Sequence, residues 1–228
     1  MLEWIRSVLK SPSRLYRLRK RGHDWEKQWN TPAFSPKWGG RDAPPEIVEA
    51  VASGWLPPSG KVLDIGCGLG EIAAWFAQRG YDALGVDIAP SAVRQAQAVH
   101  AALPHPPKFS AMDLCTDVPP GGPFDILIDR GCLHGIPKKF VPDFVRYIAA
   151  ASAPQARMLL FMRAYRDERP FADEIETREH VAWTTEALRG YFAIESHTPT
   201  YLSSDGKLDP SNALPGIVYR VRRVASSS

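Results

Sequence analysis

The residues of this sequence that most suggest chemistry are three closely spaced glycines and the acids around them. Residues 64–71 read DIGCGLGE, so glycine occupies every second position of a short segment. The strand-like KVLDI ends in this segment, and the helix-like IAAWFAQRG follows it. A glycine-rich turn lets the backbone approach a bound molecule closely, and the helix after it aims its first N–H groups at that molecule. The stretch therefore predicts a ligand site between a strand and a helix.

The glycine spacing excludes two common nucleotide sites. A dinucleotide-binding turn has the pattern G-x-G-x-x-G, whereas Gly66, Gly68 and Gly70 form G-x-G-x-G. Glu71 occupies the position that a dinucleotide fold fills with glycine. No lysine follows the turn, so a P-loop for a triphosphate is excluded as well.

Three aspartate residues indicate which chemical groups the ligand carries. Asp64 stands two residues before the first glycine, and Asp87 and Asp113 each end an expected strand. We expect Asp87 to accept hydrogen bonds from two ribose hydroxyls, and Asp113 to accept one from the exocyclic amine of adenine. An adenosine with an amino-acid tail and no pyrophosphate fits this set. S-adenosylmethionine is such a molecule.

Strands and helices alternate along the chain in a way that predicts one α/β domain. Single helices between strands imply right-handed crossovers and a parallel sheet that is covered on both faces. We therefore expect a Rossmann-like, doubly wound, mostly parallel sheet in three α/β/α layers, with a closing antiparallel strand. The expected strands are 61–66, 82–87, 108–113, 124–129 and 156–162, the expected helices lie near 70–79, 90–103 and 138–152, and the closing pair is 191–198 and 216–224.

The successive motifs resemble those of class I S-adenosylmethionine-dependent methyltransferases. The similar stretches are VLDIGCGLGEIAAWFAQRGYDALGVDIAPSAV, SAMD and FDILIDRG, which together cover roughly residues 60–165. The resemblance implies S-adenosylmethionine as the cofactor, with no metal, and S-adenosylhomocysteine as the product. The cofactor-binding residues that it and the spacing imply are Trp25, Trp29, Asp64, Gly66, Cys67, Gly68, Gly70, Asp87, Ile88, Asp113, Leu114 and Asp129.

Two further stretches are similar to the thiopurine S-methyltransferase-like branch of that class. DWEKQW (24–29) matches its W-x-x-x-W pair, and DRGCLHGIP (129–137) matches its D-R-G after the fourth strand. The resemblance implies that Trp25 and Trp29 cover the cofactor, while Asp129 and Arg130 line the methyl-transfer pocket. It also implies a small-molecule acceptor, with thiol sulfur favoured.

The residues themselves leave the acceptor atom open. A thiol ionises with little help, and a cation such as Arg130 would stabilise the thiolate. A phenol or an amine would need a general base, for which His134 is the candidate. His134 could instead be hydrogen-bonded to backbone, and Asp129 could cap the turn that follows it. The alternatives are an O- or N-methyltransferase of a natural-product or quinone-like molecule, and a non-catalytic S-adenosylmethionine-binding sensor or partner subunit.

The charge distribution divides the 228 residues into two parts. The net charge is +3, but residues 1–21 hold seven Lys/Arg and one acid, which leaves the remainder at −3. We interpret residues 1–40 as a basic arm and an aromatic lid, and 41–228 as the methyltransferase domain. The mildly acidic body gives no reason to expect nucleic acid. The basic arm is either a weak contact with an anionic membrane surface or a solvated segment packed on the body.

The cysteines and the charged segment 163–184 give two further expectations. Three cysteines at no metal-ligand spacing indicate reduced thiols and a cytoplasmic location. Residues 163–184 are charged and are expected to be loop-like, either as a solvated excursion or as a source of substrate contacts through Arg163, Tyr165, Arg166 or Trp183. The sequence makes no prediction of oligomeric state.

Overall fold

The computed structural model describes residues 22–31, 34, 43–166, 169–170, 173–202 and 214–224. The basic arm (1–21) and most of the segment 32–42 lie outside this part of the chain, so the predicted membrane contact and the proposed boundary at residue 40 stay predictions. Residues 22–29 are helical. Within the described residues, no helix is both long enough and apolar enough to cross a membrane.

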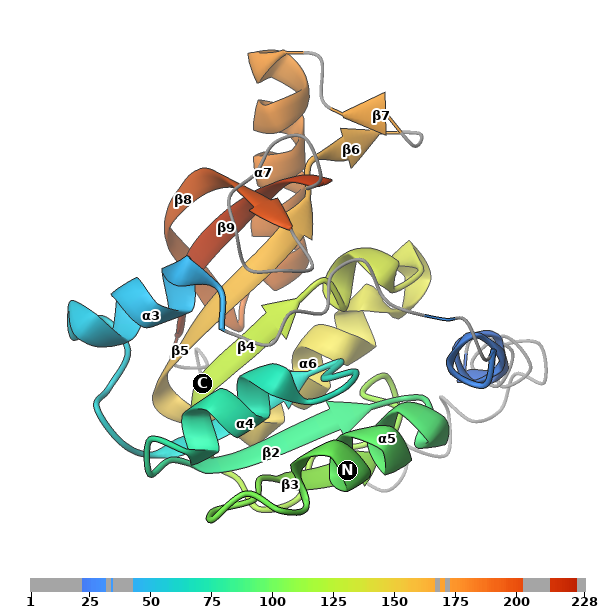
Figure 1. Cartoon of the computed structure of the whole chain (residues 1–228). Coiled ribbons are helices and arrows are strands. Elements are labelled where there is room, and N and C mark those ends of the chain that lie inside the picture. Colours follow the sequence, from blue (N-terminus) through green and yellow to red (C-terminus); the bar gives the residue numbers. More distant parts are fainter. Residues whose placement is uncertain are drawn as a thin grey trace, which may run out of the picture.

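Seven strands form one sheet in the spatial order β3-β2-β1-β4-β5-β9-β8 (Figure 1). The strands β1 to β5 are parallel to one another, and β9 is antiparallel to both of its neighbours. This confirms the predicted fold class. The strands are β1 (Lys61–Ile65), β2 (Asp82–Asp87), β3 (Lys108–Ala111), β4 (Phe124–Arg130), β5 (Ser152–Arg163), β8 (Phe192–Leu202) and β9 (Leu214–Arg223).

Helices connect the strands and cover the sheet. A short 3-10 turn, η1, and a second, η2, precede the long helix between β4 and β5. The helices and turns are α3 (Pro45–Ala52), α4 (Glu71–Ala77), α5 (Pro90–His100), η1 (Leu133–Gly135), η2 (Lys138–Phe140), α6 (Val141–Ala151) and α7 (Glu174–Leu188).

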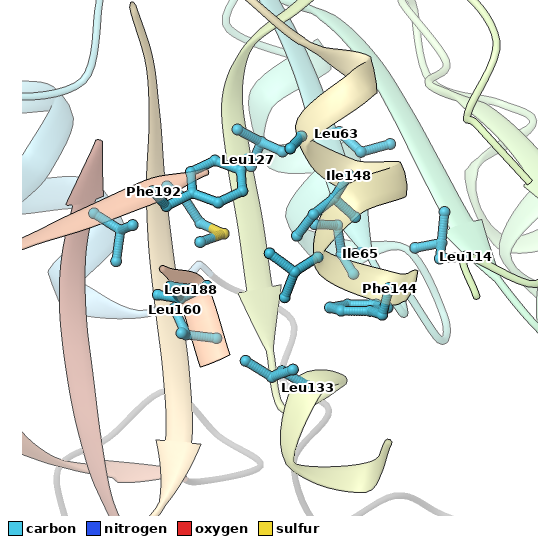
Figure 2. Packing of buried hydrophobic residues seen from close by; sticks show 14 of the residues in the cluster. Leu63, Ile65, Leu114, Leu127, Leu133, Phe144, Ile148, Leu160, Leu188 and Phe192 are labelled. Carbon is cyan, nitrogen blue, oxygen red and sulfur yellow. The ribbon is translucent and has the colours of Figure 1, made fainter. Parts of the chain in front are cut away.

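Buried side chains of the sheet alternate between two hydrophobic clusters, because successive residues of a strand point to opposite faces. On β4, Leu127 belongs to one cluster, while Ile126 and Ile128 belong to the other. The first cluster includes Phe144 of α6 and Leu188 of α7 (Figure 2). The second cluster includes residues of α3 and α4. Apolar residues on both faces are typical of a parallel sheet between two helical layers.

The segment after β5 differs from its sequence-based prediction. Residues 163–184 were expected to be loop-like, but the 15-residue helix α7 occupies Glu174–Leu188. The Asp173 carboxylate caps this helix by accepting the N–H groups of Ile175 and Glu176. Two of its three buried residues, Glu176 and Thr184, are polar, so its sequence shows little apolar periodicity. A two-strand ribbon, β6 (Tyr165–Arg166) and β7 (Arg169–Pro170), precedes it.

Candidate active site

The glycine turn joins β1 to α4 at the carboxyl ends of the parallel strands, where ligands of open α/β sheets bind. Gly68 has a φ of +54°, a left-handed conformation that a side chain would strain. A Cβ at Gly68 would lie 3.3 Å from the indole of Trp29, and a Cβ at Gly66 would lie 2.9 Å from the Cβ of Cys132. The glycines thus allow Trp29 and the loop after β4 to close tightly around the turn.

Asp87 ties the end of β2 to this turn. Its Oδ2 accepts the N–H of Gly68 at 3.1 Å, and its Oδ1 accepts the N–H of Ala89 at 2.9 Å. Burial raises the pKa of the Asp87 carboxyl, although these hydrogen bonds oppose that effect. Each carboxylate oxygen retains a lone pair for a further donor, such as a ribose hydroxyl.

Asp113 follows β3, the neighbour of β2 at the edge of the sheet. Its Oδ1 accepts the N–H of Cys115 at 2.9 Å. Asp87 and Asp113 therefore lie at the ends of adjacent strands, and both line the same cavity. Two carboxylates in one cavity provide hydrogen-bond acceptors for hydroxyl or amine groups of a ligand.

The helical segment 22–29 brings both tryptophans of the W-x-x-x-W pair to the cavity. A spacing of four residues places two side chains on one face of a helix. Glu26, between them, accepts hydrogen bonds from the N–H and the hydroxyl of Ser91, at 2.9 Å and 2.8 Å. Because Ser91 lies in the first turn of α5, this carboxylate anchors the segment to the domain.

The cavity has a volume of about 250 Å³, which suits small molecules rather than a macromolecular surface. It includes ten of the predicted site residues: Trp25, Trp29, Gly66, Gly68, Asp87, Ile88, Asp113, Leu114, Arg130 and His134. Its other lining residues are Val86, Met112, Gly131, Cys132, Gly135, Ile136, Phe144, Arg163, Leu202 and Leu214. Of these, only Arg163 was named from the sequence as a substrate contact.

Three predicted cofactor residues, Asp64, Cys67 and Gly70, are not among the cavity-lining residues of the described chain. Asp64 is buried and accepts the N–H of Ala73 at 3.1 Å, which fixes the start of α4. Burial raises the pKa of Asp64 to about 7, and the negative charges of nearby acids add to the effect. Cys67 is buried, and burial raises the pKa of its thiol. Gly70 directly precedes α4.

Asp129 is not among the cavity-lining residues of the described chain, and its predicted role in the methyl-transfer pocket stays a prediction. Its carboxylate is buried and accepts the N–H groups of Gly131, Cys132 and Leu133, at 3.0 Å, 2.7 Å and 3.0 Å respectively. Burial raises the pKa of Asp129 to about 7 against the opposing effect of these hydrogen bonds. The carboxylate caps the turn after β4, as the alternative interpretation held, and so positions the loop that carries His134.

Arg130 is the last residue of β4 and lines the cavity. Burial lowers the pKa of its guanidinium, while the negative charges of Glu46, Glu71 and Asp64 oppose that effect. Because β4 pairs with β1 in the register Ile65↔Asp129, Arg130 lies beside the start of the glycine turn.

His134 lies on η1, facing the end of β5. Its Nδ1 accepts the backbone N–H of Arg163 at 3.4 Å. Burial, together with the smaller effects of the nearby charges of Arg163 and His180, lowers the pKa of His134 to about 4. The imidazole is therefore neutral at physiological pH. Among the described residues, no group of three or more His, Cys, Asp or Glu side chains is arranged to hold a metal ion.

Comparisons with known proteins find methyltransferases. Residues 62–155 match the family described as "Methyltransferase domain". The chain is 28% identical over 178 residues to a 2-heptyl-1-hydroxyquinolin-4(1H)-one methyltransferase of Mycobacteroides abscessus. The aligned region covers 76% of this chain and 76% of that relative. The match to the thiopurine S-methyltransferase-like branch is not confirmed by these comparisons.

Solved structures share the fold. A structure from work on the conversion of a disulfide bond into a thioacetal group during echinomycin biosynthesis has a TM-score of 0.70 and 21% identity, and covers 90% of this chain and 94% of its own. The 1,6-didemethyltoxoflavin-N1-methyltransferase of Burkholderia thailandensis has a TM-score of 0.60 and 18% identity, and covers 95% and 92% respectively. At these identities the likeness is one of fold.

Proposed function

We propose that this chain, which is an S-adenosylmethionine-dependent methyltransferase of small molecules, methylates an oxygen or a nitrogen on a compact, largely apolar heteroaromatic acceptor. The observation that carries the proposal is the composition of the cavity wall away from the glycine turn. Four apolar side chains contribute to this part of the lining: Ile136, Phe144, Leu202 and Leu214. Such a wall favours a flat apolar body with few polar groups. The hydroxyquinolone named for the Mycobacteroides relative has this character.

S-adenosylmethionine supplies a methyl group already activated on a sulfonium, so the protein mainly aligns the reactants and excludes water. We assign the ribose hydroxyls to Asp87 and the adenine amine to Asp113. Trp25 and Trp29 would cover the adenosine, because both line the cavity and a Cβ at Gly68 would lie 3.3 Å from the indole of Trp29. Arg130, beside the turn, would neutralise the carboxylate of the amino-acid tail. Asp64 and Asp129 hold the two loops in place.

Thiol sulfur is the second candidate acceptor. Two observations favour it: the likeness of DRGCLHGIP and DWEKQW to S-methyltransferases, and the cationic residues Arg130 and Arg163 in the lining, whose charge would stabilise a thiolate. The apolar wall suits an aromatic thiol as well as a hydroxyl compound. We rank oxygen and nitrogen first because of the relative that matches most of the chain.

Release of S-adenosylhomocysteine from S-adenosylmethionine tests the proposal. The acceptor panel contains a 1-hydroxyquinolin-4(1H)-one, an aromatic thiol, phenols, a carboxylic acid and an amine. The proposal expects turnover with the hydroxyquinolone or another oxygen or nitrogen acceptor. Turnover confined to thiols would move the second candidate ahead, and binding of the cofactor without turnover on any acceptor would contradict both.

A further inference from the structure

We propose that the acceptor is bound and methylated as an anion, held by the Nε2–H of His134 and the positive charge of Arg163, and that none of the side chains that the structure describes acts as its general base. This inference rests on the proposed function and narrows its substrate class to acidic groups. An N-hydroxy group, an enol, an acidic phenol and a thiol belong to that class. A simple alcohol or an alkylamine does not.

The order of strands separates a cofactor end of the cavity from an acceptor end. Asp87 and Asp113 follow β2 and β3, on one side of β1 and β4. Arg163 ends β5, on the other side, and His134 lies on the loop that packs against it. Leu202 and Leu214 come from β8 and β9 at the far edge of the sheet. An acceptor opposite the adenosine would therefore meet His134 and Arg163.

The hydrogen bond from Arg163 assigns the tautomer of His134. A ring nitrogen that accepts an N–H carries no hydrogen of its own, so Nδ1 has the lone pair and Nε2 has the hydrogen. Nε2 is then a donor and cannot take a proton from the acceptor. Gly131, which also lines the cavity, leaves room for this edge of the ring, since a Cβ there would lie 3.0 Å from Cε1 and 3.5 Å from Nε2 of His134.

The groups around His134 reinforce its neutrality. Arg163 approaches it from β5 and His180 from α7, and burial has the largest effect on its pKa. These causes together hold the pKa of His134 near 4, so a proton taken up by this ring at neutral pH would be strongly acidic. Driving force for proton transfer falls as the base weakens.

The other titratable lining residues do not supply a base at the acceptor end. Asp87 and Asp113 lie at the cofactor end and accept backbone N–H groups there. Cys132 lies against Gly66 of the glycine turn. Asp129, which the sequence placed in the pocket, is not among the cavity-lining residues of the described chain and holds the loop. Arg130 and Arg163 add positive charge to the described lining, which favours an anion.

The transfer then needs no proton movement. The acceptor loses its proton to water before it binds. Its lone pair forms the new bond to the methyl carbon, while the electron pair of the breaking S–C bond returns to the sulfonium sulfur, which becomes a neutral thioether. The acceptor's negative charge and the sulfonium's positive charge are both lost, so the methylated product is neutral and no longer attracted by Arg163.

The pH dependence of kcat/KM for a series of acceptors of one shape tests this inference. A suitable series is a hydroxyquinolone, a nitro-substituted phenol, an unsubstituted phenol with a pKa of about 10, and an aromatic thiol. If the acceptor reacts as its anion, the rising limb of each profile follows the pKa of that acceptor and shifts from one compound to the next. If the rising limb of the pH profile lies at the same pH for all acceptors, it reports the titration of a base on the enzyme, and the inference is wrong.

Two variants of His134 make the test specific. His134→Gln retains an N–H donor, and we expect a loss of about two- to tenfold in kcat/KM with the acceptor-dependent limb intact. His134→Phe removes the donor, and we expect a rise of about ten- to 100-fold in KM for the anion. A loss of about 100- to 10,000-fold in kcat for both variants, with disappearance of the limb, is the signature of a general base. No turnover with any acceptor at any pH would instead refute the proposed function itself.

Discussion

The backbone N–H of Arg163 donates to Nδ1 of His134 across 3.4 Å, and so joins the last residue of β5 to the loop after β4. Asp129, at the base of the same loop, accepts three backbone N–H groups. The loop is thus fixed at both ends, and the ring it carries is held in one tautomer. This rigidity is what allows a neutral histidine to act as a directed donor.

Asp87→Ala should weaken the binding of S-adenosylhomocysteine by about 1–3 kcal/mol, the usual cost of losing a buried hydrogen-bond partner. Isothermal titration calorimetry measures this directly. Asp82→Ala is the matched control, because Asp82 begins the same strand and forms an exposed ion pair with Lys108. Unaltered affinity in the Asp87 variant would refute the assignment of the ribose.

Gly68→Ala should reduce cofactor affinity more than it reduces stability. The positive φ of Gly68 strains any side chain by roughly 1–2 kcal/mol, and the new methyl group would also press on Trp29. Gly80→Ala is the control, since Gly80 has a φ of +87° and no neighbour within 4 Å of an added Cβ. Thermal unfolding should show similar losses in both variants. Only Gly68→Ala should lose affinity for S-adenosylhomocysteine, and equal affinities would contradict the close contact with Trp29.

The fold was predictable because its strands are buried on both faces, which leaves plain apolar runs such as VLDI and FDILID in the sequence. The residues that we propose for the adenosine could be brought together from the sequence for a related reason. Gly66, Gly68, Asp87 and Asp113 lie at or just after the ends of successive strands, the carboxyl ends of parallel strands meet at one edge, and all four residues line one cavity.

The acceptor side could not be predicted in the same way. Ile136, Phe144, Leu202 and Leu214 come from separate elements, and nothing in their local sequence distinguishes a cavity wall from a core. An acid at a strand end, such as Asp129, can face a ligand or cap the next turn, and only the positions of the backbone N–H groups show that its carboxylate caps the turn. The helix α7, which Asp173 caps, was missed because Glu176 and Thr184 on its buried face are polar and leave little apolar periodicity in the sequence.

Asp64→Asn should change how stability depends on pH. Burial holds the pKa of Asp64 at about 7, above its value of about 3.9 in an unfolded chain. The contribution of this group to stability is therefore fully present below about pH 4 and is lost as the pH rises toward 7. Asparagine does not titrate, so the variant should gain stability relative to the wild type between about pH 5 and about pH 8.

Urea unfolding of the ligand-free protein at both pH values measures that gain. Asp82→Asn serves as the control, because its side chain is exposed and its replacement should leave the pH dependence as it is. If the difference in the free energy of unfolding between Asp64→Asn and the wild type is the same at about pH 5 and at about pH 8, burial does not raise the pKa of Asp64.

Ile136→Ala should impair the use of apolar acceptors without affecting the cofactor. The side chain is half-buried and lines the cavity on the loop after η1. Removing its apolar contacts should lower kcat/KM for a hydroxyquinolone by about five- to 30-fold, mainly through KM, which corresponds to roughly 1–2 kcal/mol. Val99→Ala, at a position 62% exposed on α5, should have no such effect. Loss of S-adenosylhomocysteine affinity in Ile136→Ala would place this residue at the cofactor end instead.

The most direct test of the central claim is transfer of a labelled methyl group to a defined atom. The protein is incubated with S-adenosylmethionine that carries a trideuterated methyl group and with an equimolar mixture of a 1-hydroxyquinolin-4(1H)-one and its aromatic thiol counterpart. Mass spectrometry and NMR of the products then locate the label. The account predicts a trideuteromethyl group on an oxygen or nitrogen of the hydroxyquinolone, formed at a rate that Asp87→Ala reduces and Asp82→Ala does not. Bound cofactor with no label on either small molecule would contradict it.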